Sequence, residues 1–404
     1  MEYKGLEYLR NKLRQKRTRV LTRYTYYEMK DKSKELSVVI PHELRQKYTS
    51  TLGWCAKAVD SLSDRLTFKG FSEDYFDFNG IFSLNNPDIL TDSAILSALI
   101  SSCSFIYIAK ENDFPRLQVI DGGNATGIID EITGMLFEGY AVLERNNSGE
   151  AIHEAYFTIG ETSYYKKGIG LYRRDKNVAP FALLVPIINR PDAARPFGHS
   201  RISRACMYYQ EFAKRTMERS DITAEFYSFP QKYVLGTDPE ADQLESWRAT
   251  ISSFLQFDKD NEGGHPVIGQ FNTPSMSPFT EQIRTAAAGF AGETGLTLDD
   301  LGFASQNPSS ADAIKASHET LRITARKAQR TFSTGFLNVG FLSACLRDNF
   351  TYKRSQIYQT KTRWEPVFTP DASSMGAYGD AILKISQAIP GYFTDERIED
   401  ILGL

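Results

Sequence analysis

Hydrophobic and polar positions follow two periods along this chain, and the first half of it predicts a mixture of helices and strands. Apolar residues at helical spacing predict helices over 53–65 and 89–100, the second entered through Asn86-Pro87-Asp88. Runs rich in aromatic and β-branched residues, separated by turn clusters, predict strands at 105–109, 117–120, 139–145, 155–159 and 170–174. The pattern predicts an α+β domain with an antiparallel meander.

A long helix is predicted next, from about Ser200 to Tyr227, after a proline-punctuated extended connection over 183–196. Its charges alternate in sign, and its apolar stripe is narrow, with Tyr209, Phe212 and Met217 as the large members. A helix with so narrow a stripe cannot be buried in its own domain. We therefore expect these three side chains to contact a copy of the same helix or a neighbour.

The remaining pattern predicts mostly helices. A strand at 229–235, a helix at 241–255 and a strand at 266–271 come first. An Ala-rich helix over 281–291 and the longest helical pattern, from Ala311 to about Cys345, follow, and we expect Gly335 and Gly340 to bend the latter. A strand within 355–368 and one or two small helices over 376–403 complete the chain. Ser200 and Ser310 are expected to cap the helices that start beside them.

A glycine-bearing polar loop separates the Ala-rich helix from the longest one. Gly292, Gly295 and Gly302 resemble the glycines of phosphate-binding loops, but no Lys-Ser or Lys-Thr pair follows them, which excludes a Walker site. The five histidines share no spacing with Cys, Asp or Glu that suggests a metal. We expect no active site, no metal and no cofactor.

Composition changes this picture little. The chain of 404 residues is 41% hydrophobic and 24% charged, which predicts a folded protein of several structural units. No apolar run is long enough to span a bilayer, and the N-terminus carries no secretion signal, so no membrane partner is expected. Four widely separated cysteines predict buried thiols in a reducing cytoplasm.

Charge is unevenly placed. The net charge of −3 argues against DNA binding over the whole surface. A basic run interleaved with tyrosines nevertheless lies near the N-terminus: Arg10, Lys12, Arg14, Lys16, Arg17, Arg19 and Arg23. One interpretation, which we favour, is a solvated amphipathic helix with Leu6, Leu9 and Leu13 on its apolar side; the other is a nucleic-acid-binding arm.

The order of these parts resembles the portal protein of tailed double-stranded DNA bacteriophages, of the siphophage type. Four stretches carry the resemblance: Pro196-Phe-Gly-His-Ser-Arg-Ile202, the segment 224–236 (AEFYSFPQKYVLG), the segment 294–302 (TGLTLDDLG) and Asn307-Pro-Ser-Ser-Ala-Asp-Ala-Ile314. Weaker support comes from 53–66. Together they are spread over positions 53 to 314, which is most of the chain, and their order and spacing are more specific than any one of them.

The resemblance implies a portal fold with named segments. The wing is implied at 1–199, with its second part and the long bent helix at 311–370. Two stem helices are implied at 200–227 and 278–293, a small α/β clip at 228–277 and a small helical crown at 371–404. The tunnel loop at 294–310 would line the narrowest part of the channel with Gly295, Leu296, Thr297, Leu298, Asp299, Asp300, Leu301, Gly302 and Phe303. Its leucines would pack against neighbouring loops, and both aspartates would face DNA.

The function that the resemblance implies is a conduit without enzymatic activity. Portal subunits form a ring, of twelve copies in the family, at one capsid vertex of the virion, after assembly in the host cytoplasm. Double-stranded DNA passes through the channel without sequence specificity during packaging and ejection. The implied partners are the terminase packaging motor, the head–tail connector, and the major capsid and scaffold proteins. A mildly acidic chain suits the passage of DNA better than tight binding of DNA, because a strongly basic channel lining would bind the phosphate backbone.

Two other functions stay open at this point. One is a nucleic-acid-processing enzyme of a mobile element, with the basic run as its DNA arm. The other is a head-assembly scaffold that never contacts DNA. The size of the purified particle separates them, because a large closed ring is expected only of a portal.

Overall fold

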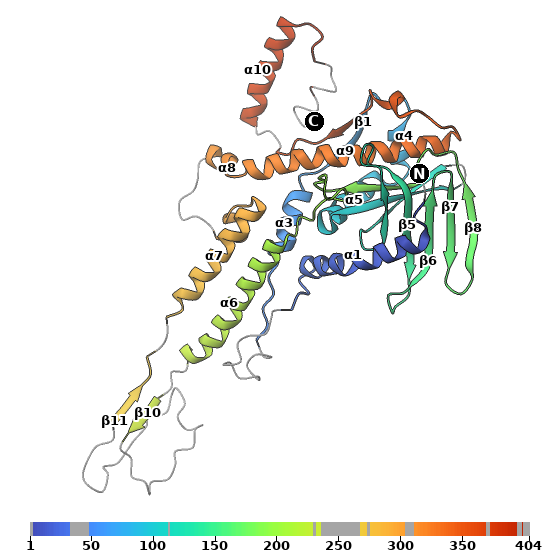
Figure 1. Ribbon diagram of the computed structural model, residues 1–404. Coiled ribbons are helices and arrows are strands. Elements are labelled where there is room, and N and C mark those ends of the chain that lie inside the picture. Colours follow the sequence, from blue (N-terminus) through green and yellow to red (C-terminus); the bar gives the residue numbers. More distant parts are fainter. Residues whose placement is uncertain are drawn as a thin grey trace. The chain divides into compact units, whose positions relative to one another are not determined.

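The chain divides into two compact units in the computed structural model (Figure 1), which describes residues 3–32, 48–111, 114–228, 232–235, 267–272, 275–303, 311–368, 372–393 and 398. Unit 1 comprises Met1–Asp31, Gly53–Met207 and Phe290–Leu404, and unit 2 comprises Lys32–Leu52 and Tyr208–Gly289. Helices α6 (Arg204–Ser228) and α7 (Ser277–Thr294) each contribute residues to both units.

The meander in unit 1 is a five-stranded antiparallel sheet in the order β4-β5-β6-β7-β8. Its strands are β4 (Ala125–Ile129), β5 (Leu136–Arg145), β6 (Ala151–Thr158), β7 (Glu161–Lys166) and β8 (Gly170–Lys176). The predicted α+β class and the meander are confirmed. Strands β4 and β7 were not predicted, because one carries a glycine at its centre and the other is mostly polar.

A second sheet of unit 1 has the order β3-β2-β9, with β2 (Cys103–Glu111), β3 (Phe114–Ile120) and β9 (Leu184–Ile188). The expectation that 183–196 is only an extended connection is wrong for its first part. Pro186 lies opposite Phe105 in the β2–β9 pairing. Proline is tolerated there because β9 is an edge strand, where one face of the backbone makes no ladder hydrogen bonds.

Four helices of unit 1 precede or separate these strands: α1 (Leu6–Tyr27), α3 (Trp54–Ser63), α4 (Phe78–Ser83) and α5 (Pro87–Ser101). Helix α1 lies along the meander (Figure 1), where its Leu9 and Leu13 form a core cluster with Tyr140 and Val142 of β5. The amphipathic helix predicted for the basic run is therefore present, and its apolar side is buried. All four cysteines are free and buried, as predicted.

The longest helix, α9 (Glu319–Arg347), forms much of the core of unit 1. It runs on through Gly335 and Gly340, and the helical pattern is interrupted instead at His318, which separates it from α8 (Ala311–Ser317). A methyl group at Gly335 would lie 2.7 Å from Ile187 Cδ1, and one at Gly340 would lie 2.8 Å from the Phe78 ring. These glycines allow close packing against β9 and α4.

Three short elements and the last helix complete unit 1. Strand β12 (Lys361–Trp364) pairs antiparallel with β1 (Phe68–Ser72) after the 3₁₀ turn η2 (Arg354–Ile357). Phe68, Phe336 and Trp364 meet there, with ring centroids 4.8 to 6.0 Å apart. Helix α10 (Ala372–Ala388) follows, with mostly exposed side chains.

The start of α6 differs from the prediction. The helix begins at Arg204, and Ser203, not Ser200, caps it, because Ser203 Oγ accepts a hydrogen bond from the Cys206 amide at 3.2 Å. Ser200 instead donates to the carbonyl of Ile100 at 2.6 Å and ties this segment to the end of α5. Ser310 lies outside the described residues.

Unit 2 contains most of α6, the first part of α7 and a two-stranded sheet. Strands β10 (Lys232–Leu235) and β11 (Val267–Gln270), which were both predicted as strands, pair antiparallel with each other. The helix expected at 241–255 lies outside the described residues. Helices α6 and α7 approach closely at Gly289, where an added methyl group would lie 2.4 Å from the Tyr209 ring.

Candidate functional site

The loop that follows α7 turns immediately after the helix ends at Thr294. Gly295 has φ +69°, and a methyl group there would lie 2.8 Å from Thr320 Cγ2, at the start of α9. A side chain is disfavoured on both counts. The loop then forms the 3₁₀ turn η1 (Asp299–Leu301), which ends at Gly302 with φ +89°. Residues 304–310 of the predicted tunnel loop lie outside the described residues.

The leucines of this loop are largely buried within one chain. Leu296 is 6% exposed and Leu301 is 8% exposed, while Leu298 and Phe303 are half-buried. The expectation that these leucines lie exposed unless neighbouring loops cover them is therefore wrong for Leu296 and Leu301. Their burial needs no second subunit.

The two aspartates of the loop differ in orientation. Asp300 accepts hydrogen bonds from the backbone amide and the hydroxyl of Thr297, at 2.8 and 2.9 Å, and its Oδ2 lies 3.8 Å from His318 Nδ1. Asp300 therefore stabilises its own loop. The side chain of Asp299 is exposed. Of the pair expected to face DNA, Asp299 is the one whose exposure suits that role.

A buried arginine anchors the start of the loop. Arg201 is only 7% exposed, and its guanidinium donates to the carbonyls of Ala58, at 3.3 Å, and of Thr294. Burial lowers the pKa of Arg201 to about 10, so it stays protonated at neutral pH. Ser203 Oγ adds a hydrogen bond to Glu293 at 2.8 Å. These hydrogen bonds of Arg201 could not be predicted from the sequence, because both carbonyls belong to segments distant in the chain.

The residues predicted to form the contact face of α6 do not share one set of neighbours. Tyr209 packs against Gly289 of α7 in the same unit. Phe212 stacks on Tyr208, with ring centroids 6.3 Å apart and planes 13° apart, and Tyr208 is 56% exposed. Met217 is half-buried. The stacked aromatic pair is thus the exposed Tyr208 and the half-buried Phe212, and Tyr208 was missed because Tyr209 was assigned to the stripe in its place.

The opposite face of α6 explains why the apolar stripe is narrow. Gln210, Lys214 and Glu218 are almost fully buried, although all are polar. Ser50 donates to Glu218 Oε1 from its amide at 3.2 Å and its hydroxyl at 3.0 Å, and the hydroxyl also donates to the carbonyl of Lys214. A polar face that is hydrogen-bonded can be buried without an apolar stripe.

The described part of the chain shows neither a metal-ligand cluster nor a membrane-spanning helix. No three His, Cys, Asp or Glu side chains among these residues come together as metal ligands would. Within the same ranges, no helix combines the length and apolarity that crossing a membrane requires.

Two curated proteins are similar to this chain. It is 25% identical over 323 residues to the portal protein of Mycobacterium phage L5, an alignment that covers 74% of this chain and 65% of that protein. It is 23% identical over 409 aligned positions to the portal protein of Mycobacterium phage D29, covering 94% of this chain and 81% of that protein. The matched region thus spans just under two thirds of the L5 protein. No protein-family model matches the chain.

Solved structures with a similar chain come from a gene transfer agent. A chain of the native particle's virion matches with a TM-score of 0.47 at 10% identity, covering 96% of this chain and 99% of that one. A chain of the neck of the empty particle, computed with C6 symmetry, matches with a TM-score of 0.48 at 12% identity, covering 94% and 97%. At TM-scores below 0.5 these are distant likenesses and support no inference about assembly.

Proposed function

We propose that this chain, whose resemblance to phage portal proteins is confirmed by its similarity to those of two mycobacteriophages, is itself a portal subunit of a tailed phage. The observation that carries the proposal is the D29 alignment, which extends over 94% of the chain. A match of this extent includes both units, and not merely a shared domain. In this role the chain is a virion component and catalyses no reaction.

The ring is the finer part of the proposal. We infer that twelve copies close head to tail around a channel, since a heterologous contact that closes by rotation gives a ring. The stacked pair of the exposed Tyr208 and the half-buried Phe212 supports a subunit contact on α6, because aromatic side chains are enriched at the centre of interfaces. Tyr209 and Met217 of the predicted face contribute at its edge.

The channel is the next part. We propose that the loop from Gly295 to Phe303 lines the channel, with Asp299 toward the DNA. One exposed carboxylate per copy repels phosphate weakly, since salt screens the interaction over about 8–10 Å. Weak repulsion of that kind favours sliding of a duplex over tight binding. The packaging motor and the head–tail connector would dock on the segment 228–277, and the capsid and scaffold proteins on the wing.

The test is the location of the chain in finished virions. Antibody raised against the purified chain and coupled to gold should label one site per particle, at the junction of head and tail. Label distributed over the shell, or absent from DNA-filled particles, would contradict the proposal. A head-assembly scaffold and an enzyme of a mobile element both predict the second of those results.

A further inference from the structure

Four basic side chains lie along one flank of α1. Lys12, Lys16, Arg19 and Arg23 follow one another at spacings of four, three and four residues, which places them on the same side of a helix. They span about 16 Å at 1.5 Å per residue. Arg195, from the segment after β9, lies close enough to Arg23 for the two charges to interact. We call these five residues the cationic row.

The cationic row makes no ion pair with any described residue. In the basic run of α1, Arg10 is bonded to Glu7 and Glu154, but no described carboxylate lies within ion-pair distance of the row. Its members instead repel one another. After burial, the pKa of Arg23 is lowered by Arg19 and Arg195, and that of Lys12 by Lys16. The fold therefore holds like charges together, and the Glu138 carboxylate, which acts on Lys12 without forming an ion pair, offsets them only in part.

Contacts with unit 1 fix several of these side chains in place. Lys12 Nζ donates to the carbonyl of Gly127 at 2.8 Å and lies 5.2 Å from the Phe197 ring centroid. Lys16 Nζ lies 5.1 Å from the Phe105 ring centroid. Arg23 donates to the carbonyl of Ser101 at 3.4 Å. Because these side chains are already ordered, binding an anion would cost little additional side-chain entropy.

A solvated amphipathic helix would distribute its charges differently. The outermost positions of α1 are Asn11, Gln15, Thr18 and Thr22, all exposed and uncharged. The four cations of the row lie together on the flank of α1 that is beside Arg195, whereas Arg10, Arg14 and Arg17 lie on the opposite flank. Charges placed only for solubility belong on the outward face, interspersed with acidic residues.

We propose that the cationic row binds the phosphate backbone of double-stranded DNA, at a second place on the chain besides the loop 295–303. A duplex carries one phosphate per 3.4 Å of axis on each strand, so the row spans about five base pairs along the axis and contacts those phosphates of the winding strand that face it. A straight, rigid row without acidic members suits this regular polyanion better than an acidic protein segment, whose charges are irregular. The inference rests on the proposed function only in that a portal works beside DNA.

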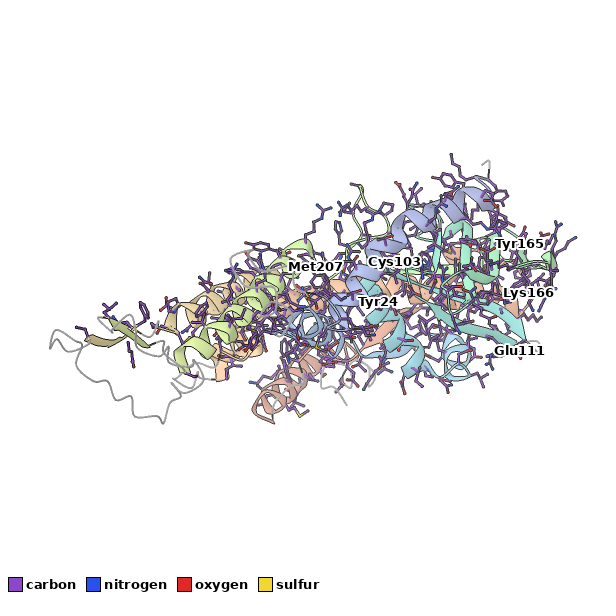
Figure 2. All side chains as sticks on the ribbon, turned by 90° about the horizontal axis from the view of Figure 1, so that it is seen from below. Tyr24, Cys103, Glu111, Tyr165, Lys166 and Met207 are labelled. Carbon is purple, nitrogen blue, oxygen red and sulfur yellow. The ribbon has the colours of Figure 1, made fainter. Side chains whose placement is uncertain are left out.

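The test is DNA binding by the full-length chain as salt is varied. A fluorescent 20-base-pair duplex of random sequence is titrated with protein at several KCl concentrations from 50 to 200 mM, and anisotropy gives the binding constant. The row variant carries Lys16→Gln, Arg19→Gln and Arg195→Gln. The matched control removes the same charge from exposed sites elsewhere in unit 1, through Lys57→Gln, Lys166→Gln and Lys176→Gln. Figure 2 shows Lys166 well away from Tyr24, the neighbour of Arg23.

The row variant should bind at least roughly tenfold more weakly at 100 mM salt, and the slope of log K against log salt should fall by up to about 3, near 0.9 per lost phosphate contact. The control should keep the wild-type slope. Equal slopes for the row variant and the wild type would overturn the proposal, as would a wild type that does not bind. Tighter row-dependent binding of polyglutamate than of DNA would assign the row to an acidic protein.

Two further measurements keep these outcomes interpretable. If circular dichroism shows that the row variant is unfolded, Arg19→Gln with Arg195→Gln, both exposed, should still lower the slope by up to about 2. The particle size of each preparation is measured in parallel. A chain that binds DNA through the row but never forms rings would retain this inference and contradict the portal assignment.

Discussion

Hydrogen bonds of two charged side chains hold the candidate channel loop in its conformation. Arg201 donates hydrogen bonds to the carbonyls of Thr294 and Ala58, and Asp300 accepts a hydrogen bond from the Thr297 amide within the loop. Each contact involves a charged partner, and such hydrogen bonds contribute about 1.5–3 kcal/mol to stability. The loop is thus held at its start and at its centre.

Replacing Arg201 with Met should destabilise the chain by about 1–3 kcal/mol, because two buried carbonyls lose their donor. Urea unfolding at pH 7 measures the effect. Arg190→Met, a neighbouring exposed arginine, serves as the control and should change stability by less than about 0.5 kcal/mol. Equal stability of the two variants would show that the Arg201 contacts contribute nothing.

The Asp300–Thr297 contact is best measured as a pair. Asp300→Ala removes the two hydrogen bonds that the Asp300 carboxylate accepts. Thr297→Val removes the hydroxyl bond at 2.9 Å and the bond from the Asp300 amide to Thr297 Oγ1 at 3.1 Å, and keeps the bond from the Thr297 amide. The double variant should therefore be more stable than the sum of the single losses predicts, by about 0.5–1.5 kcal/mol in unfolding free energy. Strictly additive losses would mean that the side chains do not interact in solution.

At the scale of elements, the packing of α9 accounts for its glycines. Gly340→Ala should improve helix propensity by about 1 kcal/mol, yet it forces a methyl group to 2.8 Å from the Phe78 ring. Overpacking costs about 1–3 kcal/mol, so the net effect should be destabilising. Gly292→Ala in α7, where a methyl group meets nothing within 4 Å, should be neutral or stabilising. A thermal melt that ranks the two variants in reverse would contradict this packing.

Local hydrophobic period was sufficient to predict the helices α1, α3, α5, α7 and α9 and the strands β5 and β6 of the meander, because each of these elements signals its own buried face. Features that depend on distant partners were not predictable. Strand β9 contains Pro186 and is recognisable only beside β2, and Ser200 is directed to the end of α5 instead of capping α6. For the candidate site, the sequence identified the loop but not the burial of Leu296 and Leu301, which requires the fold of unit 1.

At the scale of the whole molecule, ring assembly should depend on the stacked side chains of Tyr208 and Phe212 on α6. Phe212→Asp with Tyr208→Asp should give soluble, folded subunits that fail to close, because unpaired charges would be buried at every repeated contact. Ile132→Asp, which alters a side chain that is 94% exposed in unit 1, is the matched control and should still assemble. Analytical ultracentrifugation distinguishes the two outcomes. Wild-type rings from the double variant would exclude this face of α6 from the contact.

The central claim is that this chain forms a closed ring around a channel. Negative-stain class averages of the purified wild-type chain, with particle mass measured on the same sample, test it most directly. We expect rings with a central opening, rotational symmetry and a mass near twelve copies of the 45.6 kDa chain. Monomers or two-fold dimers at every concentration, with no central opening in any class, would contradict the account.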